Sequence, residues 1–205
     1  MNPILENIKF IHRTIAAGRD EGDPRSAMTS SVKTAKYDVV SHTVNRIDVA
    51  TGVEFDEFIA EFEAAAPVVD RGVVSEIASR GGTWDDVLAA ADANAPHGLM
   101  VYGKIDVLPF FSIAGHTTKA VEYLLGNHTI AETMFRHDPK AMLYAPLRLL
   151  IHADADGNAV LTMDQPSAVF GSLGITEVTA VGYSLDRKVA NLLRVIGIDA
   201  DEAFR

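Results

Sequence analysis

The chain has 205 residues, of which 48% are apolar and 22% charged, a balance typical of a globular protein with a substantial core. Its formal net charge of −10 disfavours nucleic acid and anionic membranes as partners, because a phosphate-rich surface would repel it. The absence of cysteine excludes disulfides, thiolate metal sites and a cysteine nucleophile, and no apolar run reaches the ~20 residues that span a bilayer. We therefore expect a soluble, cytoplasmic protein.

Residues 1–36 predict an N-terminal amphipathic helix followed by a linker arm. Asn2 and Pro3 are typical of a helix cap and a first helical residue. The polar stretch 18–31 contains glycine and proline and indicates the linker. The apolar stripe of the helix recurs at helical spacing and consists of Ile4, Ile8, Ile11 and Ile15. Such a stripe has to be buried on the chain's own domain or on a partner subunit, and we expect a homodimer.

Residues 37–205 predict an α+β domain. The segment 36–49 is strand-like, and the segment 54–67 predicts a helix that buries its phenylalanines. Two short helical pieces are expected within 71–98, on either side of Gly81 and Gly82.

The second half of this domain predicts further strands and a closing helix. Segments 99–107 and 119–126 are typical of strands, and 142–164 predicts a β-hairpin that turns at Asp156 and Gly157, a favoured type I′ pair. A final helix is expected from Ser184 as cap, with an inward face of Val189, Leu192, Leu193 and Ile196.

The stretch 124–175 resembles the DUF302 family, a group of bacterial domains of unknown function. The matching pieces, in order, are Asp106 at the end of 98–106, Gly126-Asn127 before a helix, Pro146-Leu147-Arg148, Asp156-Gly157 and Pro166. The resemblance covers roughly 37–198, with 67–97 as an inserted helical segment. It implies a TBP-like α+β fold, in which helices pack on one face of a curved antiparallel sheet, and a dimer. The family has no agreed active site, so it assigns no catalytic residue.

The stretch 126–139 places His128, Glu132 and His137 in one predicted helix. At about 100° per residue, His137 lies on the side opposite His128, so the three residues cannot form one cluster. His128 stands where the family usually has proline, and the backbone N–H gained there has no intrahelical partner. A helix N-terminus disfavours imidazolium, so His128 should be neutral and able to accept a proton or ligate a metal. The plainer interpretation is a boundary histidine that is hydrogen-bonded to a backbone group.

Glu132 also has two structural interpretations. It has the spacing of a capping box with Thr129, and it precedes Arg136 at the i,i+4 spacing of a helical ion pair. His42 and His152 are expected in strands, where a hydrogen-bonded sheet histidine is more common than a ligand.

The combined pattern predicts a small, mainly apolar pocket between sheet and helices that binds an organic molecule. Its polar end would hold His128 and Glu132, and cofactor-independent acid–base chemistry would use His128 as base with Glu132 or Asp106 orienting it. The alternative is a haem or divalent-metal protein with His128 as ligand; the leading hypothesis requires no cofactor. Each predicted lining residue could instead fill the core: Tyr102, Phe110, Phe111, Tyr123, Met134 and Tyr144.

Overall fold

The computed structural model describes residues 33–205, and residues 41–205 form one compact unit. The expected helix with Ile4, Ile8, Ile11 and Ile15 lies outside the described residues. Residues 33–45 have no regular secondary structure, so the strand predicted from residue 36 in fact begins at Arg46. The strand that pairs with it ends at Asp164, opposite Arg46. The residues before Arg46 therefore have no strand partner, apart from one hydrogen bond that the Gln165 N–H donates to the Asn45 carbonyl.

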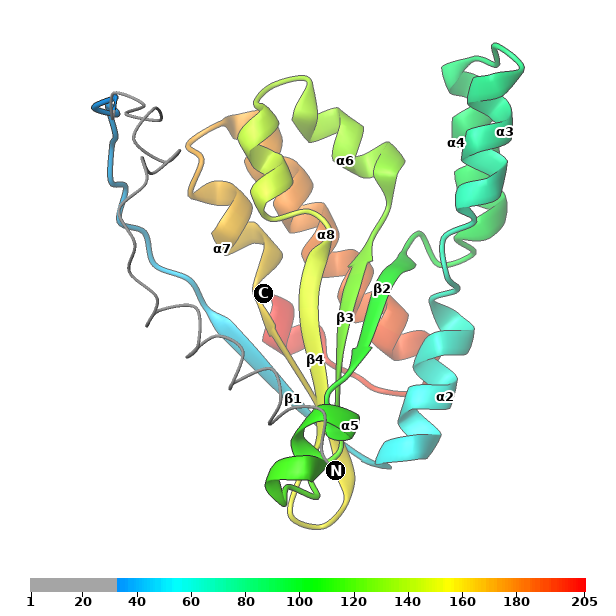
Figure 1. Cartoon of the computed structure of the whole chain (residues 1–205), viewed down its shortest axis with the longest axis vertical. Helices are drawn as coiled ribbons and strands as arrows, with labels where there is room; N and C mark the ends of the chain where they lie inside the picture. The colour runs from blue at the N-terminus through cyan, green and yellow to red at the C-terminus, as the bar shows by residue number, and fades with distance from the viewer. Residues whose placement is uncertain (1–32) are drawn as a thin grey trace, which may run out of the picture. The chain divides into compact units, whose positions relative to one another are not determined.

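Five strands form one open antiparallel sheet in the order β1-β5-β4-β3-β2 (Figure 1). Their bounds are β1 Arg46–Glu54, β2 Met100–Asp106, β3 Ala120–Gly126, β4 Leu147–Ala153 and β5 Asn158–Asp164. Side chains alternate between the two faces, because the side-chain period of a strand is two residues. In β3, for example, Val121, Tyr123 and Leu125 are buried on the core face, and Glu122 and Leu124 lie on the other face.

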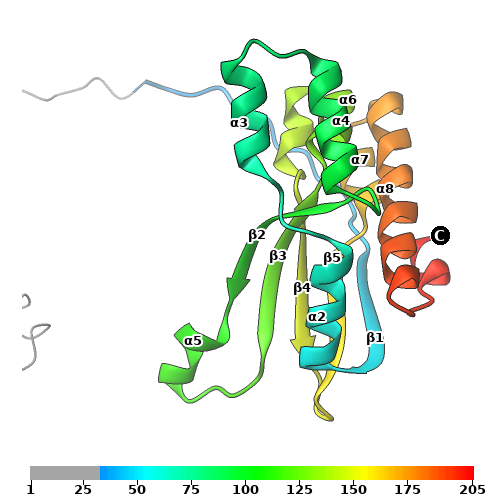
Figure 2. The same cartoon turned by 90° about the vertical axis from the view of Figure 1, so that its right-hand side faces the viewer.

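The described residues also form helices, some of which cover the core face of the sheet. Their bounds are α2 Phe55–Ala65, α3 Arg71–Ser79, α4 Trp84–Asn94, α5 Leu108–Phe111, α6 His128–Phe135, α7 Pro166–Gly171 and α8 Thr176–Val195, with short 3-10 turns η2 Ser112–Ala114, η3 Pro139–Leu143 and η4 Asp201–Phe204. Figure 2 shows α2 and α8 on the same side of the sheet, and both supply buried residues to its core. The predicted α+β architecture, with an antiparallel sheet and helices on one face, is confirmed. None of the helices in residues 33–205 has the length and apolar character needed to cross a bilayer.

Helix α8 begins at Thr176, and the prediction of a helix capped by Ser184 is wrong. The apolar stripe continues toward the N-terminus through Leu185 and Val178, which are both buried. Between them stands Gly182, where a Cβ would lie 2.9 Å from the Ser167 Cα of α7. The glycine thus allows two helices to approach closely.

The turn between β4 and β5 spans Asp154 to Gly157 and is not the predicted type I′ turn. Gly157 has a φ of +87°, but no non-glycine residue in the described chain has a positive φ, so Asp156 does not meet the type I′ requirement. The Asp154 carboxylate accepts the backbone N–H groups of Asp156 and Asn158, each at 2.9 Å. This side-chain cap favours a four-residue turn.

Candidate functional site

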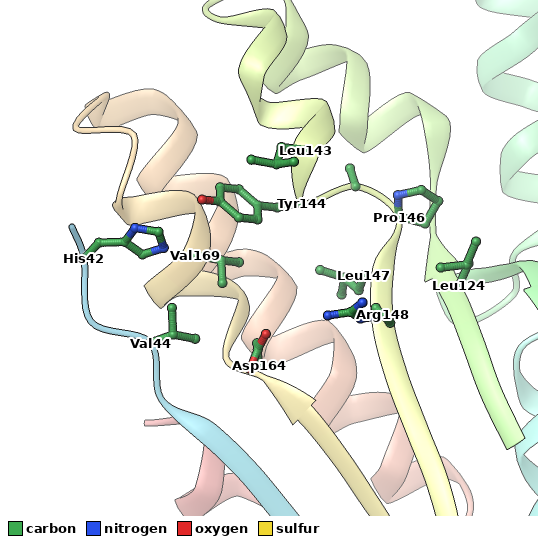
Figure 3. Close-up of a pocket in the computed structure, with 11 residues that line it drawn as sticks. His42, Val44, Leu124, Leu143, Tyr144, Pro146, Leu147, Arg148, Asp164 and Val169 are labelled. Carbon is green, nitrogen blue, oxygen red and sulfur yellow. The ribbon is translucent and has the colours of Figure 1, made fainter. Parts of the chain in front are cut away.

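A pocket of about 560 Å³ opens at one end of the sheet, over the face that carries Leu124 and Arg148; we call it the sheet-end pocket (Figure 3). Its floor comes from the sheet, where Arg148 of β4 lies opposite Leu124 of β3 and next to Asp164 of β5. The other walls come from the chain before β1, the end of η3 and α7. Its full lining is His42, Val44, Leu124, Leu143, Tyr144, Ala145, Pro146, Leu147, Arg148, Asp164 and Val169.

The sheet register brings the charged groups of this pocket together. Leu149 of β4 pairs with Met163 of β5, so Arg148 and Asp164, one position further, are neighbours on the open face. Figure 3 shows both side chains near the floor of the pocket, yet within residues 33–205 no ion pair joins Arg148 to Asp164 or to another carboxylate. A guanidinium stays charged and is therefore available to an anionic group.

Tyr144 forms the aromatic wall of the pocket. Its ring meets His42 and Phe170 edge-on, with centroid distances of 6.3 and 6.0 Å. The preceding turn η3 starts where the Asp138 carboxylate accepts the Lys140 backbone N–H at 2.8 Å, and it ends immediately before Tyr144. A local cap thus holds Tyr144 at the pocket.

A second polar centre joins Tyr102 of β2 to His128 at the start of α6. The β2–β3 register shifts between Val101 and Gly103, and this bulge turns Tyr102 toward the helix. The Tyr102 hydroxyl accepts the His128 backbone N–H at 2.8 Å and lies 2.6 Å from His128 Nδ1. The backbone N–H of His128, which a proline at this position would lack, thus has a hydrogen-bond partner outside α6. Asn127 caps the helix as predicted, by accepting the Thr129 N–H at 2.9 Å.

The hydrogen bonds of Tyr102 favour one tautomer of His128. A phenol has a single proton, and because its oxygen already accepts the His128 N–H, that proton is best donated to Nδ1. The imidazole proton then resides on Nε2, which is buried and has no hydrogen-bond partner in the described chain. Burial lowers the pKa of His128 and raises the pKa of Tyr102, so both side chains are neutral at pH 7.

His128 lines a separate cleft of about 290 Å³, formed with the helical pair α3 and α4; we call it the hairpin cleft. Asp70 at its edge caps α3 by accepting the N–H groups of Gly72 and Val73. Asn94 accepts the Asp70 N–H and donates to the Val68 carbonyl. The remaining walls are apolar and small, and consist of Val73, Val74, Ala90, Ala91 and Ala93.

The acidic residues that were predicted to assist His128 have other partners. The Glu132 carboxylate forms an ion pair with Arg136, the helical pairing that the sequence offered as an alternative. Asp106 accepts the Leu108 N–H at 3.1 Å and lies four residues beyond Tyr102 along β2, about 13 Å away in an extended strand. The expectation that Asp106 orients His128 does not agree with this geometry.

The predicted pocket residues do not gather around one cavity. Tyr144 lines the sheet-end pocket and Tyr102 contacts His128, whereas Tyr123 and Met134 are fully buried in the core, where the Tyr123 hydroxyl donates to Glu63 at 2.5 Å. Phe110 and Phe111 lie on α5, at the end of the molecule opposite α6 (Figure 1), and are 70% and 55% exposed. They therefore cannot line the same site as His128.

Sequence reasoning missed the charged groups and His42 of the sheet-end pocket. Arg148 and Asp164 each carried a signal, since a charged residue in an otherwise apolar strand marks an open face. Their proximity depends on strand register, which the sequence alone did not provide. In the described part of the chain, no three His, Asp or Glu side chains come together as a metal site, so His128 does not belong to a metal site of that kind there.

Comparison with known proteins places this fold in a family. A family model described as "Domain of unknown function DUF302" matches residues 76–195, a match that begins inside the segment expected to be an insertion. A solved structure titled "Crystal structure of uncharacterized conserved protein DUF302 from Bacillus stearothermophilus" is similar, with a TM-score of 0.52 and 13% identity over 73% of this chain and 95% of that chain. No curated protein matches. The family match covers more than half of the chain, and the chain belongs to the DUF302 family.

Proposed function

We propose that the protein binds a small, mainly apolar organic molecule with an anionic end group in the sheet-end pocket. The observation that carries this proposal is a cavity of about 560 Å³ that combines apolar walls with Arg148, which has no ion-pair partner in the described chain. Its volume falls within the range of about 300 to 1,000 Å³ that is usual for small-molecule sites.

The polar groups of the pocket suggest how such a ligand is oriented. The Arg148 guanidinium suits a carboxylate or sulfonate, because its parallel N–H groups match two oxygens of one anion. Asp164, beside it, can accept a hydrogen bond from a hydroxyl or amine on the same ligand. Leu124, Val44 and Val169 contact the apolar body.

Anilinonaphthalene sulfonate, which has an apolar ring system and an anionic group, tests this proposal by fluorescence titration. Arg148→Gln should weaken binding about tenfold, the equivalent of about 1.4 kcal/mol for one charged contact. Leu143→Trp, which adds bulk to the pocket wall, should also weaken binding. The matched control is Arg136→Gln, an exposed arginine outside the pocket, where Arg136 pairs with Glu132. Equal affinities for the parent, Arg148→Gln and Leu143→Trp would reject the proposal.

The geometry around His128 restricts the acid–base role that the sequence predicts for it. With Nδ1 accepting from Tyr102, the favoured neutral imidazole offers a donor at Nε2 and has no free basic nitrogen. His128 is thus better suited to polarise a carbonyl than to abstract a proton. Haem or a divalent metal at His128 remains the alternative prediction; it requires Nε2 to lose its proton, and visible absorption of the purified protein tests the haem form.

A further inference from the structure

We infer that the sheet-end pocket selects a zwitterion, an α-amino acid with an apolar side chain, over a ligand that carries the anionic group alone. The inference rests on the proposed function and names the ligand class of the same site. Arg148 binds the carboxylate of this molecule and Asp164 binds its ammonium group, so one ligand pairs with both charges of the pocket floor.

The register of β4 and β5 sets the spacing of these two charged side chains. Leu149 pairs with Met163, and one position further along the two strands Arg148 and Asp164 are neighbours on the open face. Side chains that are opposite one another in an antiparallel pair begin about 4.5 to 5.5 Å apart at their Cβ atoms. The two charges of the ligand must be similarly close. An α-amino acid meets this requirement, because its ammonium and carboxylate groups are attached to the same carbon.

Both charges of the floor are accessible and unpaired in the part of the chain that the structure describes. Arg148 and Asp164 are exposed at the pocket, and no ion pair within residues 33–205 includes either of them. On its other side Asp164 is opposite Arg46 of β1, but Arg46 pairs with Asp48 at 3.4 Å. The pocket therefore offers one cation and one anion side by side to a ligand.

A ligand with a single charge would pair with only half of this floor. A carboxylate alone is attracted by Arg148 but repelled by Asp164 beside it, and an amine alone has the reverse problem. A zwitterion gains both attractions. Its apolar side chain also has a place, since Figure 3 shows Leu143 and Tyr144 across the cavity from Arg148 and Asp164. The charged end of the ligand lies on the floor and its apolar end against these two walls.

Three phenyl compounds of similar size separate the two charges of the ligand. L-Phenylalanine carries both, 3-phenylpropionate carries only the carboxylate, and 2-phenylethylamine carries only the ammonium group. Titrations of the full chain, followed by NMR of the backbone amides around the pocket, measure each Kd. L-Phenylalanine should bind at least about tenfold more tightly than either of the other two. Equal binding by either singly charged compound would overturn the inference.

Variants assign each charge of the ligand to its partner. Asp164→Asn should remove the preference for L-phenylalanine over 3-phenylpropionate, and Arg148→Gln should remove the preference over 2-phenylethylamine, because each deletes the partner of one ligand charge. The matched control is Asp156→Asn, the same change in the exposed turn at the other end of β5, outside the pocket, which should keep both preferences. An Asp164→Asn protein that still prefers L-phenylalanine over 3-phenylpropionate would contradict the inference.

Anilinonaphthalene sulfonate separates failure of this inference from failure of the proposed function. If the dye binds in a manner that depends on Arg148, while L-phenylalanine binds no more tightly than 3-phenylpropionate, the pocket takes anions and the zwitterion inference alone is wrong. If neither the dye nor any of the phenyl compounds binds, the proposed function and the inference are both wrong.

Discussion

At the scale of single residues, the role of a polar side chain depends on whether its hydrogen-bond partner lies in its own helix or in another element. His128 occupies the first position of α6, but its backbone N–H and its Nδ1 both contact the Tyr102 hydroxyl of β2. The Glu132 carboxylate, one turn later, pairs with its helical neighbour Arg136. His128 therefore makes tertiary contacts, whereas the ion pair of Glu132 is local to its own helix.

The burial of His128 predicts a stability that declines in mild acid. Its pKa is lowered in the folded protein, whereas the unfolded imidazole has the ordinary pKa of about 6.5. As the pH falls below that value, the unfolded state binds a proton first, so stability is lost as the pH approaches the folded pKa. Urea unfolding at pH 7.5 and pH 5.5 should show a smaller loss for His128→Gln than for the parent or for His137→Gln. The same loss in all three proteins would mean that His128 is not the titrating group.

At the scale of elements, the contact between α7 and α8 depends on one buried carboxylate and one glycine. Asp186 of α8 is 1% exposed and accepts the Ser167 N–H at 3.0 Å, so it caps the neighbouring helix α7. Gly182, one turn earlier, lets the two backbones meet, because a Cβ there would be 2.9 Å from the Ser167 Cα and 3.2 Å from the Phe170 Cβ.

A pair of glycine substitutions tests this packing. Gly182→Ala should destabilise the protein by about 1 to 3 kcal/mol, because the added methyl overpacks a rigid backbone contact. Gly171→Ala is the matched control in α7, since its nearest neighbour would be Thr179 Cγ2 at 3.7 Å, an ordinary contact, and alanine favours a helix. Thermal and urea unfolding measure both. A stable Gly182→Ala variant would show that α7 can shift away from α8 at little cost.

At the scale of the whole molecule, we propose a homodimer that buries the N-terminal apolar stripe. Its residues Ile4, Ile8, Ile11 and Ile15 lie outside the described chain, and the proposal rests on their helical spacing. Each isoleucine left in water would forgo about 1.5 to 3 kcal/mol of burial.

Light scattering on the full chain tests this proposal. The parent should have twice the 22.1 kDa mass of one chain, and Ile8→Asp with Ile11→Asp should shift it toward the monomer. Glu6→Gln is a suitable control, because it changes a polar position of the same segment. A parent protein that stays monomeric at all concentrations would contradict the proposal.

The sequence by itself determined the elements whose signals are local. Asn127 caps α6, the Gly81-Gly82 break separates α3 from α4, and the apolar alternation of 119–126 appears as β3. These features were predictable because a cap, a glycine break and a two-residue period each act within a few residues. The order of the short motifs also identified the family correctly.

Only the tertiary structure decided which side chains share a site. The sheet-end pocket joins His42 to Val169 across most of the chain, and its floor depends on a register that sets Arg148 beside Asp164. The bulge that turns Tyr102 toward His128 appears only in the pairing of β2 with β3. Sequence periodicity specifies which face of an element a residue occupies, but a pocket forms where faces of distant segments meet. That arrangement depends on strand pairing and on close contacts such as Gly182 against Ser167, which have no local signal.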